Sequence, residues 1–114
     1  MIAVIFEAET SESGKADYLD IAARLRPLLD EIDGFISIER FQSLTMPNKV
    51  LSLSFWRDEV AVAQWRNLPE HRKAQAAGRD HVFATYRLRI ADVLRDYGMA
   101  EREQAPDDSQ ALHS

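Results

Sequence analysis

The sequence predicts an α+β domain built on one antiparallel sheet of four strands, with the chain order β-α-β-β-α-β. Three observations predict this class. Four short segments are rich in β-forming residues, and most of them alternate between apolar and polar side chains. Helical periodicity, with apolar residues at spacings of three and four, occurs between them. The length of 114 residues suits a single domain.

The first two predicted elements are a strand and an amphipathic helix. Residues 2–8 form an apolar run that is too short for a helix and rich in β-formers, so they predict a buried strand. Between residues 15 and 33, apolar side chains recur every three or four residues, which is typical of a helix with one buried face. Pro27 lacks a backbone donor and predicts a kink, and Gly34 is expected to end the helix.

A hairpin is predicted next. Residues 35–44 and 50–56 read as strands, with Pro47-Asn48 at the turn between them. Side chains alternate cleanly along the second strand: Leu51, Leu53 and Phe55 face one way, and Val50, Ser52, Ser54 and Trp56 face the other.

The last elements are two short helices and a fourth strand. Asp58 is a predicted N-cap for a helix to about residue 67, and Pro69 fits the first turn of a helix to about residue 77, which Gly78 closes. Residues 82–93 alternate again and predict the last strand. Tyr86, Leu88 and Ile90 are expected on one face, opposed by Phe83, Thr85, Arg87 and Arg89.

This order is the ferredoxin-like arrangement, in which helices cover one face of a four-stranded antiparallel sheet. The opposite face is expected to carry Trp56, Phe83 and Phe41 beside serine and arginine side chains. A half-apolar open sheet face usually contacts a partner. We therefore expect a homodimer that pairs through the sheets.

The predicted domain covers residues 1–97. After residue 97 the composition becomes polar and acidic, so residues 98–114 are expected to form a mostly disordered tail. No apolar run approaches the roughly 20 residues of a membrane span, and the N-terminus lacks the basic segment of a signal peptide. We expect a cytoplasmic protein that does not associate with a membrane.

Composition excludes several chemistries. The absence of cysteine excludes disulfides, thiolate zinc sites, iron–sulfur clusters and cysteine nucleophiles. A net charge of −5 does not fit a nucleic-acid binder, because phosphate affinity depends on clustered Lys and Arg. Residues 65–97 nevertheless carry seven basic and four acidic side chains, which fits either a solvated helix surface or a site for one small anion.

Several short motifs resemble the antibiotic biosynthesis monooxygenase domain family. They are Gly34-Phe35-Ile36, the strand from Leu51 to Trp56, the run Trp65-Arg66-Asn67-Leu68-Pro69-Glu70-His71-Arg72, and Gly78-Arg79. The resemblance covers about residues 2–97. It implies a dimeric α+β barrel, in which two ferredoxin-like subunits close their sheets around a shared barrel.

The resemblance implies two kinds of chemistry. Cofactor-independent members oxidise quinols and anthrone-type compounds: the deprotonated substrate passes an electron to O₂, so the protein needs an apolar pocket with one or two hydrogen-bond donors. Haem-degrading members use haem as substrate and provide a proximal histidine, a polar group near the oxygen and an aromatic side chain that distorts the ring. We expect no resident cofactor, with haem as a substrate or ligand only in the second case.

Trp65 and His71 are the main catalytic candidates. The resemblance places Trp65 where haem-degrading members carry the ring-distorting tryptophan, and core packing is the alternative. His71 is a candidate base for a phenolic proton or a haem ligand, and a surface histidine is the alternative. The resemblance implies a haem-ligating histidine about ten residues after the tryptophan, where this sequence has Gln75, which is no strong axial ligand.

Glu7 is the third catalytic candidate. It occupies the first-strand position at which the haem-degrading members carry an asparagine that steers bound oxygen. A carboxylate there would repel negative charge developing near the iron. Glu7 could act as a partly buried general base, and solvent exposure or pairing with an arginine is the alternative. The changes at Glu7 and Gln75 argue against haem degradation.

The expected pocket lies between the sheet and the helices. Besides Trp65 and His71, the predicted substrate-binding residues are Leu53, Phe83, Gln75, Arg66 and Tyr86. Arg87 and Arg89 share one strand face, where they could bind an anionic substrate or form ion pairs across strands or subunits, for instance with Glu39.

Three functions remain open on the sequence alone. The leading one is a cofactor-independent monooxygenase that acts on a small aromatic or quinol-like molecule with O₂, with His71 accepting the phenolic proton and Trp65 shaping the pocket. The second is haem binding or degradation. The third is a non-catalytic dimeric module that binds a small ligand, which would be preferred if no cavity large enough for a ring existed beside Trp65.

Overall fold

The computed structural model describes residues 1–113, except for the side chains of residues 78, 80 and 111–113. The elements follow in the order β1 (Ile2–Thr10), α1 (Gly14–Leu29), β2 (Phe35–Gln42), β3 (Lys49–Trp56), α2 (Glu59–Arg66), α3 (Pro69–Ala77), a π-helical turn η1 (Gly78–Val82), β4 (Phe83–Asp92) and α4 (Asp107–His113). The four strands form one antiparallel sheet in the order β2-β3-β1-β4. The predicted ferredoxin-like α+β fold is confirmed.

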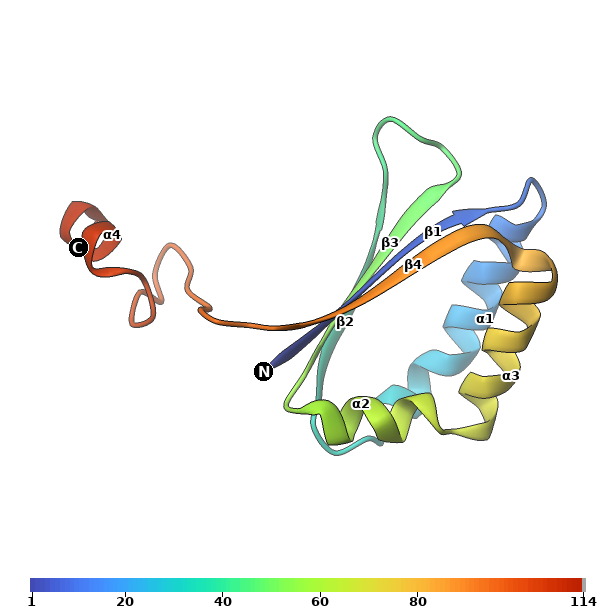
Figure 1. Cartoon of the computed structure of the whole chain (residues 1–114), viewed down its shortest axis with the longest axis horizontal. Coiled ribbons are helices and arrows are strands. Elements are labelled where there is room, and N and C mark those ends of the chain that lie inside the picture. Colours follow the sequence, from blue (N-terminus) through green and yellow to red (C-terminus); the bar gives the residue numbers. More distant parts are fainter. Residues whose placement is uncertain (114) are drawn as a thin grey trace.

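Helices α1, α2 and α3 lie on one side of this sheet (Figure 1). The long helix α1 buries Tyr18, Ala22 and Leu29, as its apolar periodicity predicts. It ends at Leu29, earlier than predicted, because a turn begins there in which the Ile32 N–H donates to the Leu29 carbonyl. Gly34 therefore does not end the helix but leads into β2 with φ of 97°, a backbone conformation that favours glycine.

Two buried clusters hold the helices against the sheet. One consists of Ala8, Tyr18, Val50 and Val82. The other consists of Leu29, Trp56, Ala61 and Val62. Trp56 is 1% exposed, and its indole N–H donates to the Ser54 hydroxyl at 2.9 Å. Both clusters contribute to the wall of the cavity described below.

The predicted strand faces are wrong for Trp56 and Phe83. Trp56 faces the helices, so Leu51, Leu53 and Phe55 lie on the open face, because alternation separates two faces without showing which one becomes covered. Phe83 also packs on the helix side, against Tyr18. The β1–β4 register shifts between Glu9 and Thr10, and this irregularity breaks the alternation of β4 at Phe83.

After β4 the chain leaves the sheet and ends in α4, far from α1–α3 (Figure 1). The segment predicted to be a disordered tail contains this helix and contacts of its own. The Arg102 guanidinium donates to the carbonyls of Gly98 and Ser109 and lies 5.2 Å from the centre of the Tyr97 ring. Among the described helices, none combines the length and apolar character that a membrane crossing needs.

Candidate functional site

A cavity of about 240 Å³ lies between the sheet and helices α1–α3. Its lining comes from β1 (Val4, Phe6), α1 (Tyr18, Ile21, Ala22, Leu25), β2 (Ile38, Arg40), β3 (Ser52, Ser54, Trp56), α2 (Val62, Trp65, Arg66), α3 (His71, Ala74, Gln75), and the segment from η1 into β4 (Val82, Phe83, Tyr86, Leu88, Ile90). Most of these side chains are apolar. An apolar cavity of about 150 Å³ can hold a benzene ring, so this one has room for a ring with a short substituent.

Small side chains on β3 create this space. Ser52 and Ser54 are buried on the helix-facing side, at central positions where larger apolar residues would fill the core. Ser52 is in register with Phe6 and Arg40, and Ser54 is in register with Val4. The cavity therefore follows from the alternation of serine with large residues along β3.

The cavity opens to solvent over β4. Tyr86, Leu88 and Ile90 belong to its lining and are nevertheless 41%, 49% and 44% exposed. Apolar side chains at an opening favour entry of an apolar molecule. A substrate can thus reach the interior without opening of the sheet.

The turn between α2 and α3 brings Trp65 and His71 together. Trp65 lies in the last turn of α2 and His71 in the first turn of α3, with ring centres 4.6 Å apart. Trp65 also packs against the cluster around Trp56, so it serves the core and the cavity wall at once.

His71 is half-buried in the cavity wall. Burial, with a smaller repulsion from Arg72, lowers the pKa of His71 below its usual value, and the Arg66 backbone carbonyl opposes this effect. Its Nδ1 atom is buried and has no hydrogen-bond partner in the described part of the chain. This shift favours the neutral imidazole, which is the form that can accept a proton.

Six of the eight residues predicted for the site line the cavity: Trp65, His71, Gln75, Arg66, Phe83 and Tyr86. Their places in the wall are structural facts, while their roles in binding or catalysis stay predictions.

Leu53 and Glu7 lie on the other side of the sheet. Leu53 alternates with Ser52 and Ser54 and does not belong to the cavity lining, so its predicted place in the pocket is wrong. Glu7 is in register with Leu51 on the open face, and its carboxylate lies 3.2 Å from the Arg89 guanidinium. Glu7 therefore pairs with an arginine, which was the predicted alternative to its role as a general base. The predicted ion pair of Arg89 is formed with Glu7 and not with Glu39.

Tyr18, Arg40 and Ser52 are polar residues of the wall that sequence reasoning missed. The Arg40 Nε–H donates to the Tyr18 hydroxyl at 3.1 Å, and its guanidinium carbon lies 5.8 Å from the centre of the Tyr18 ring. A signal existed in the sequence: Arg40 has the same parity along its strand as Ile38, which the apolar pattern places on one face.

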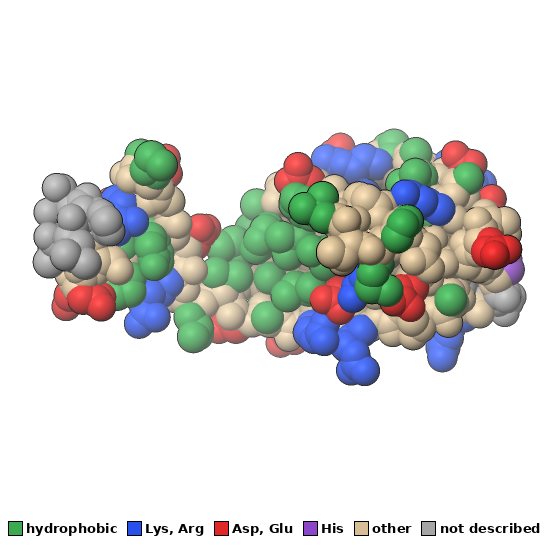
Figure 2. Space-filling view, turned by 90° about the horizontal axis from the view of Figure 1, so that it is seen from above, with side chains coloured by type: hydrophobic (Ala, Val, Ile, Leu, Met, Phe, Trp, Pro, Cys, Tyr) green, Lys and Arg blue, Asp and Glu red, His purple; other side chains and the backbone are tan. Residues whose placement is uncertain are grey.

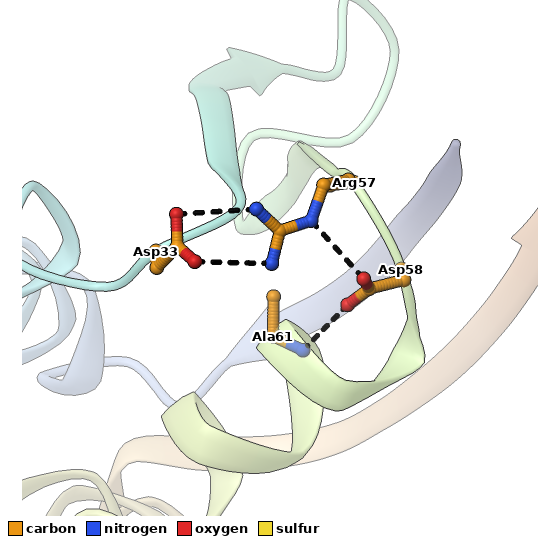
Figure 3. A network of polar contacts seen from close by, with 4 residues as sticks. All are labelled: Asp33, Arg57, Asp58 and Ala61. Carbon is orange, nitrogen blue, oxygen red and sulfur yellow. Dashed lines mark hydrogen bonds and ion pairs between the residues drawn. The ribbon is translucent and has the colours of Figure 1, made fainter.

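A network of charged side chains holds the start of α2 (Figure 3). Trp65 lies in the last turn of the same short helix, so the network helps to fix its position. The Asp58 carboxylate accepts the Ala61 N–H at 2.9 Å, which confirms the predicted N-cap. Arg57 donates to Asp58 at 3.1 Å and to both oxygens of Asp33 at 3.1 and 3.2 Å. The Ala61 N–H and Arg57 lower the pKa of Asp58, and the bond to Asp33 is the main cause that raises the pKa of Arg57.

Within the described residues, no group of three His, Asp or Glu side chains is arranged to hold a metal ion. The fold and site define a single α+β domain with a solvent-accessible, mostly apolar ligand cavity.

Comparison with known sequences identifies the family. Residues 1–77 match the sequence model of the Antibiotic biosynthesis monooxygenase family. A jasmonate monooxygenase of Pyricularia oryzae is 50% identical over 93 residues, which are 82% of this chain and 43% of that protein. The uncharacterized protein YqjZ of Bacillus subtilis is 30% identical over 93 residues, 82% of this chain and 79% of that protein. The chain belongs to the antibiotic biosynthesis monooxygenase family, and it spans less than half the length of the fungal relative.

Solved structures show the same fold. A putative antibiotic biosynthesis monooxygenase from Deinococcus radiodurans superposes with a TM-score of 0.77 at 14% identity, covering 86% of this chain and 97% of that one. SnoaB, a cofactor-independent oxygenase from Streptomyces nogalater, superposes with a TM-score of 0.72 at 14% identity, covering 83% of this chain and 94% of that one.

Proposed function

We propose that this chain is a cofactor-independent monooxygenase that oxidises a small, largely apolar molecule with O₂ inside the cavity. One observation carries the proposal: a half-buried His71, whose pKa is lowered by burial, lies in the wall of an apolar cavity in contact with Trp65. Family membership supports it, as do the names of a jasmonate monooxygenase and a cofactor-independent oxygenase among the similar proteins.

The cavity suits a reaction in which O₂ oxidises a substrate anion. His71 takes a proton from an acidic position of the substrate, and the electron-rich anion passes an electron to O₂. An apolar wall excludes water, which would otherwise quench the anion. The reaction needs no external reductant if the substrate as a whole loses two hydrogen atoms and gains one oxygen atom, because the second oxygen atom of O₂ then leaves as water.

Two substrate classes are candidates, and the first fits this scheme directly. One is an aromatic molecule of the quinol or anthrone type, whose hydroxyl or benzylic proton is acidic enough for an imidazole base. The other follows from the name of the fungal relative, since a jasmonate is a cyclopentanone that carries a carboxylate and an apolar chain. Both have a largely apolar ring system.

An oxygen electrode tests the proposal with a panel of hydroquinones, an anthrone and jasmonate. We expect O₂ consumption with at least one compound and a fall in kcat of about 100-fold or more in His71→Gln, because general-base groups commonly contribute that much. His81→Gln is the matched control, since His81 is exposed on η1 and lies outside the cavity lining. Unchanged turnover in His71→Gln would remove His71 as the base. Absence of turnover with every compound would favour a non-catalytic binding module.

Haem degradation is the second candidate, and Trp65 in the cavity wall is the observation that favours it. Against it, Gln75 stands in the wall where the resemblance implies a ligating histidine, and Glu7 lies across the sheet in a pair with Arg89. A hemin titration should therefore show no saturable Soret shift. A shift that saturates at one haem per chain, followed by bleaching with ascorbate in air, would replace the proposed function.

We also infer that two copies pair through the open sheet face. Leu51, Leu53 and Phe55 lie on this face together with Ile5, their neighbour in the sheet, and with Phe41, which is 43% exposed. Seen from above, hydrophobic side chains gather in the middle of the molecule (Figure 2). A face of this kind is covered most simply by its own copy.

A further inference from the structure

Three polar side chains meet at one part of the cavity wall, which is otherwise mostly apolar. Arg40 on β2 and Ser52 on β3 are register partners, so they are neighbours on the same face of the sheet. Tyr18 from α1 closes the group, because its hydroxyl accepts the Arg40 Nε–H at 3.1 Å. We refer to Tyr18, Arg40 and Ser52 as the polar corner.

The polar corner has unused hydrogen-bond donors. A guanidinium has five N–H groups, and in the described contacts Arg40 uses only Nε, which leaves the terminal Nη groups. The Tyr18 hydroxyl accepts from Arg40, so its own proton is available for an acceptor in the cavity. The Ser52 hydroxyl has no hydrogen bond among the contacts described, although Ser52 is 8% exposed.

The ion pairs between described residues do not include Arg40. Three other arginines of the fold contact carboxylates within 4.0 Å: Arg26 contacts Asp30, Arg57 contacts Asp33 and Asp58, and Arg89 contacts Glu7. No such contact involves Arg40 in the part of the chain that the structure describes, although Arg40 is half-buried and those three arginines are exposed. A half-buried cation without an anion is costly unless a ligand supplies the charge.

The charge of the wall has the opposite sign to that of the protein. The cavity lining contains Arg40 and Arg66 and no aspartate or glutamate, while the whole chain has a net charge of −5. The wall that bears the two arginines therefore attracts an anion and disfavours a cation. Because the rest of the lining is mostly apolar, the anion that fits best has its charge at one end and an apolar body.

We propose that the cavity binds a small carboxylic acid as its anion, with the carboxylate held by Arg40 and by the hydroxyls of Tyr18 and Ser52, and with a ring or chain in the apolar part. The proposal deepens the proposed function, because it names the substrate class of the same cavity and assigns Arg40 as the residue that determines specificity. Planar guanidinium and carboxylate groups suit each other, because they form two parallel charge-assisted hydrogen bonds.

Binding measurements with acid and ester pairs test the proposal directly. The probes are jasmonate with its methyl ester and phenylacetate with its methyl ester, titrated by calorimetry. We expect the acid of at least one pair to bind about 10-fold or more tightly than its ester, since a hydrogen bond to a charged group contributes about 10- to 100-fold in affinity.

Substitutions in the polar corner test whether these residues cause the preference for the acid. Arg40→Gln should lower the affinity for the acid by about 10-fold or more and leave the affinity for the ester unchanged, and Arg40→Lys should restore part of the loss. Tyr18→Phe should weaken acid binding by a smaller factor of about 3- to 10-fold. Arg24→Gln is the matched control, because Arg24 is exposed on α1 and lies outside the cavity lining.

The outcomes separate this proposal from the proposed function. Equal affinity for acid and ester, no binding of either, or an equal loss for acid and ester in Arg40→Gln would each overturn the carboxylate site, even if quinols are oxidised. A preference for the acid that depends on Arg40, in a protein that consumes no O₂, would leave the carboxylate site standing and overturn the oxygenase. If the acid is a substrate, Arg40→Gln should raise KM and leave kcat nearly unchanged.

Discussion

At the scale of single residues, His71 and Arg40 have contrasting environments in one cavity. Burial favours the neutral form of His71, while the Arg40 guanidinium donates to the Tyr18 hydroxyl and keeps further N–H donors. The wall therefore offers a proton acceptor and an anion-binding group at once. These are the two functions that an acidic, apolar substrate would require.

The lowered pKa of His71 predicts a pH-dependent stability. The unfolded chain binds the His71 proton more readily than the folded chain does, so this residue stabilises the fold above about pH 6.5, the unperturbed value. That contribution is lost as the pH falls through the lower pKa of the folded state. Urea unfolding at pH 7.5 and pH 5.0 should therefore show a larger loss of unfolding free energy in wild type than in His71→Gln. Equal losses of unfolding free energy in the two proteins would show that the pKa of His71 does not differ between the folded and unfolded states.

The same shift predicts the pH profile of turnover. A base must be neutral to accept a proton, so kcat should fall at acid pH with an apparent pKa below about 6.5. A kcat that does not fall at any acid pH at which the protein remains folded would contradict a role for His71 as the base.

At the scale of elements, α1 is held to the sheet by its buried side chains. Leu29 is 1% exposed within the cluster around Trp56, whereas Leu19 on the same helix is 48% exposed. The two leucines have the same chemistry and differ in burial, which makes them a matched pair.

Replacing each leucine by alanine should separate burial from helix propensity. Leu29→Ala should lower the unfolding free energy by about 3 kcal/mol, because it removes buried methyl groups and leaves a cavity. Leu19→Ala should change it by less than about 0.5 kcal/mol, since surface substitutions have small effects. Chemical denaturation of both variants provides the comparison, and similar losses would mean that α1 does not pack as described.

At the scale of the whole molecule, helices α1, α2 and α3 all lie on one side of the sheet (Figure 1). This arrangement leaves the opposite face, which carries Leu51, Leu53 and Phe55, without a helix to cover it. The cavity lies on the helix side and the inferred dimer contact on the opposite side. Ligand binding and self-association therefore use different faces of the same four strands.

A charge on the open face should prevent pairing. Leu53→Lys is expected to convert a dimer into a monomer, because a buried ammonium without a partner destabilises an apolar contact. Light scattering at two protein concentrations measures the effect, and Leu19→Lys on the exposed side of α1 is the control. A wild-type monomer, or a Leu53→Lys variant that remains dimeric, would contradict the inferred dimer. The cavity should still bind its ligand in the monomer, since Leu53 does not line it.

Local sequence signals predicted most elements and most of the cavity wall. The helical periodicity of α1, the Asp58 N-cap and the alternation along β3 are properties of neighbouring residues, and the structure contains each of them. The motif around Trp65 and His71 places both residues at one helix–helix turn, where their rings meet. Short-range geometry is set by the backbone period, and the sequence therefore reveals it.

Other features depend on residues far apart in the chain, and only the tertiary structure decided them. Helix packing determined that Trp56 rather than Leu53 faces the interior, and a register irregularity against β1 turned Phe83 inward. The pair of Arg40 and Tyr18 joins residues 22 positions apart. By itself, the sequence determined the element types, their order and the family, because these follow from local periodicity and short motifs. The covered face, the cavity and the place of Arg40 in its wall arise only when α1 packs on the sheet, because burial and side-chain contacts are properties of the packed molecule.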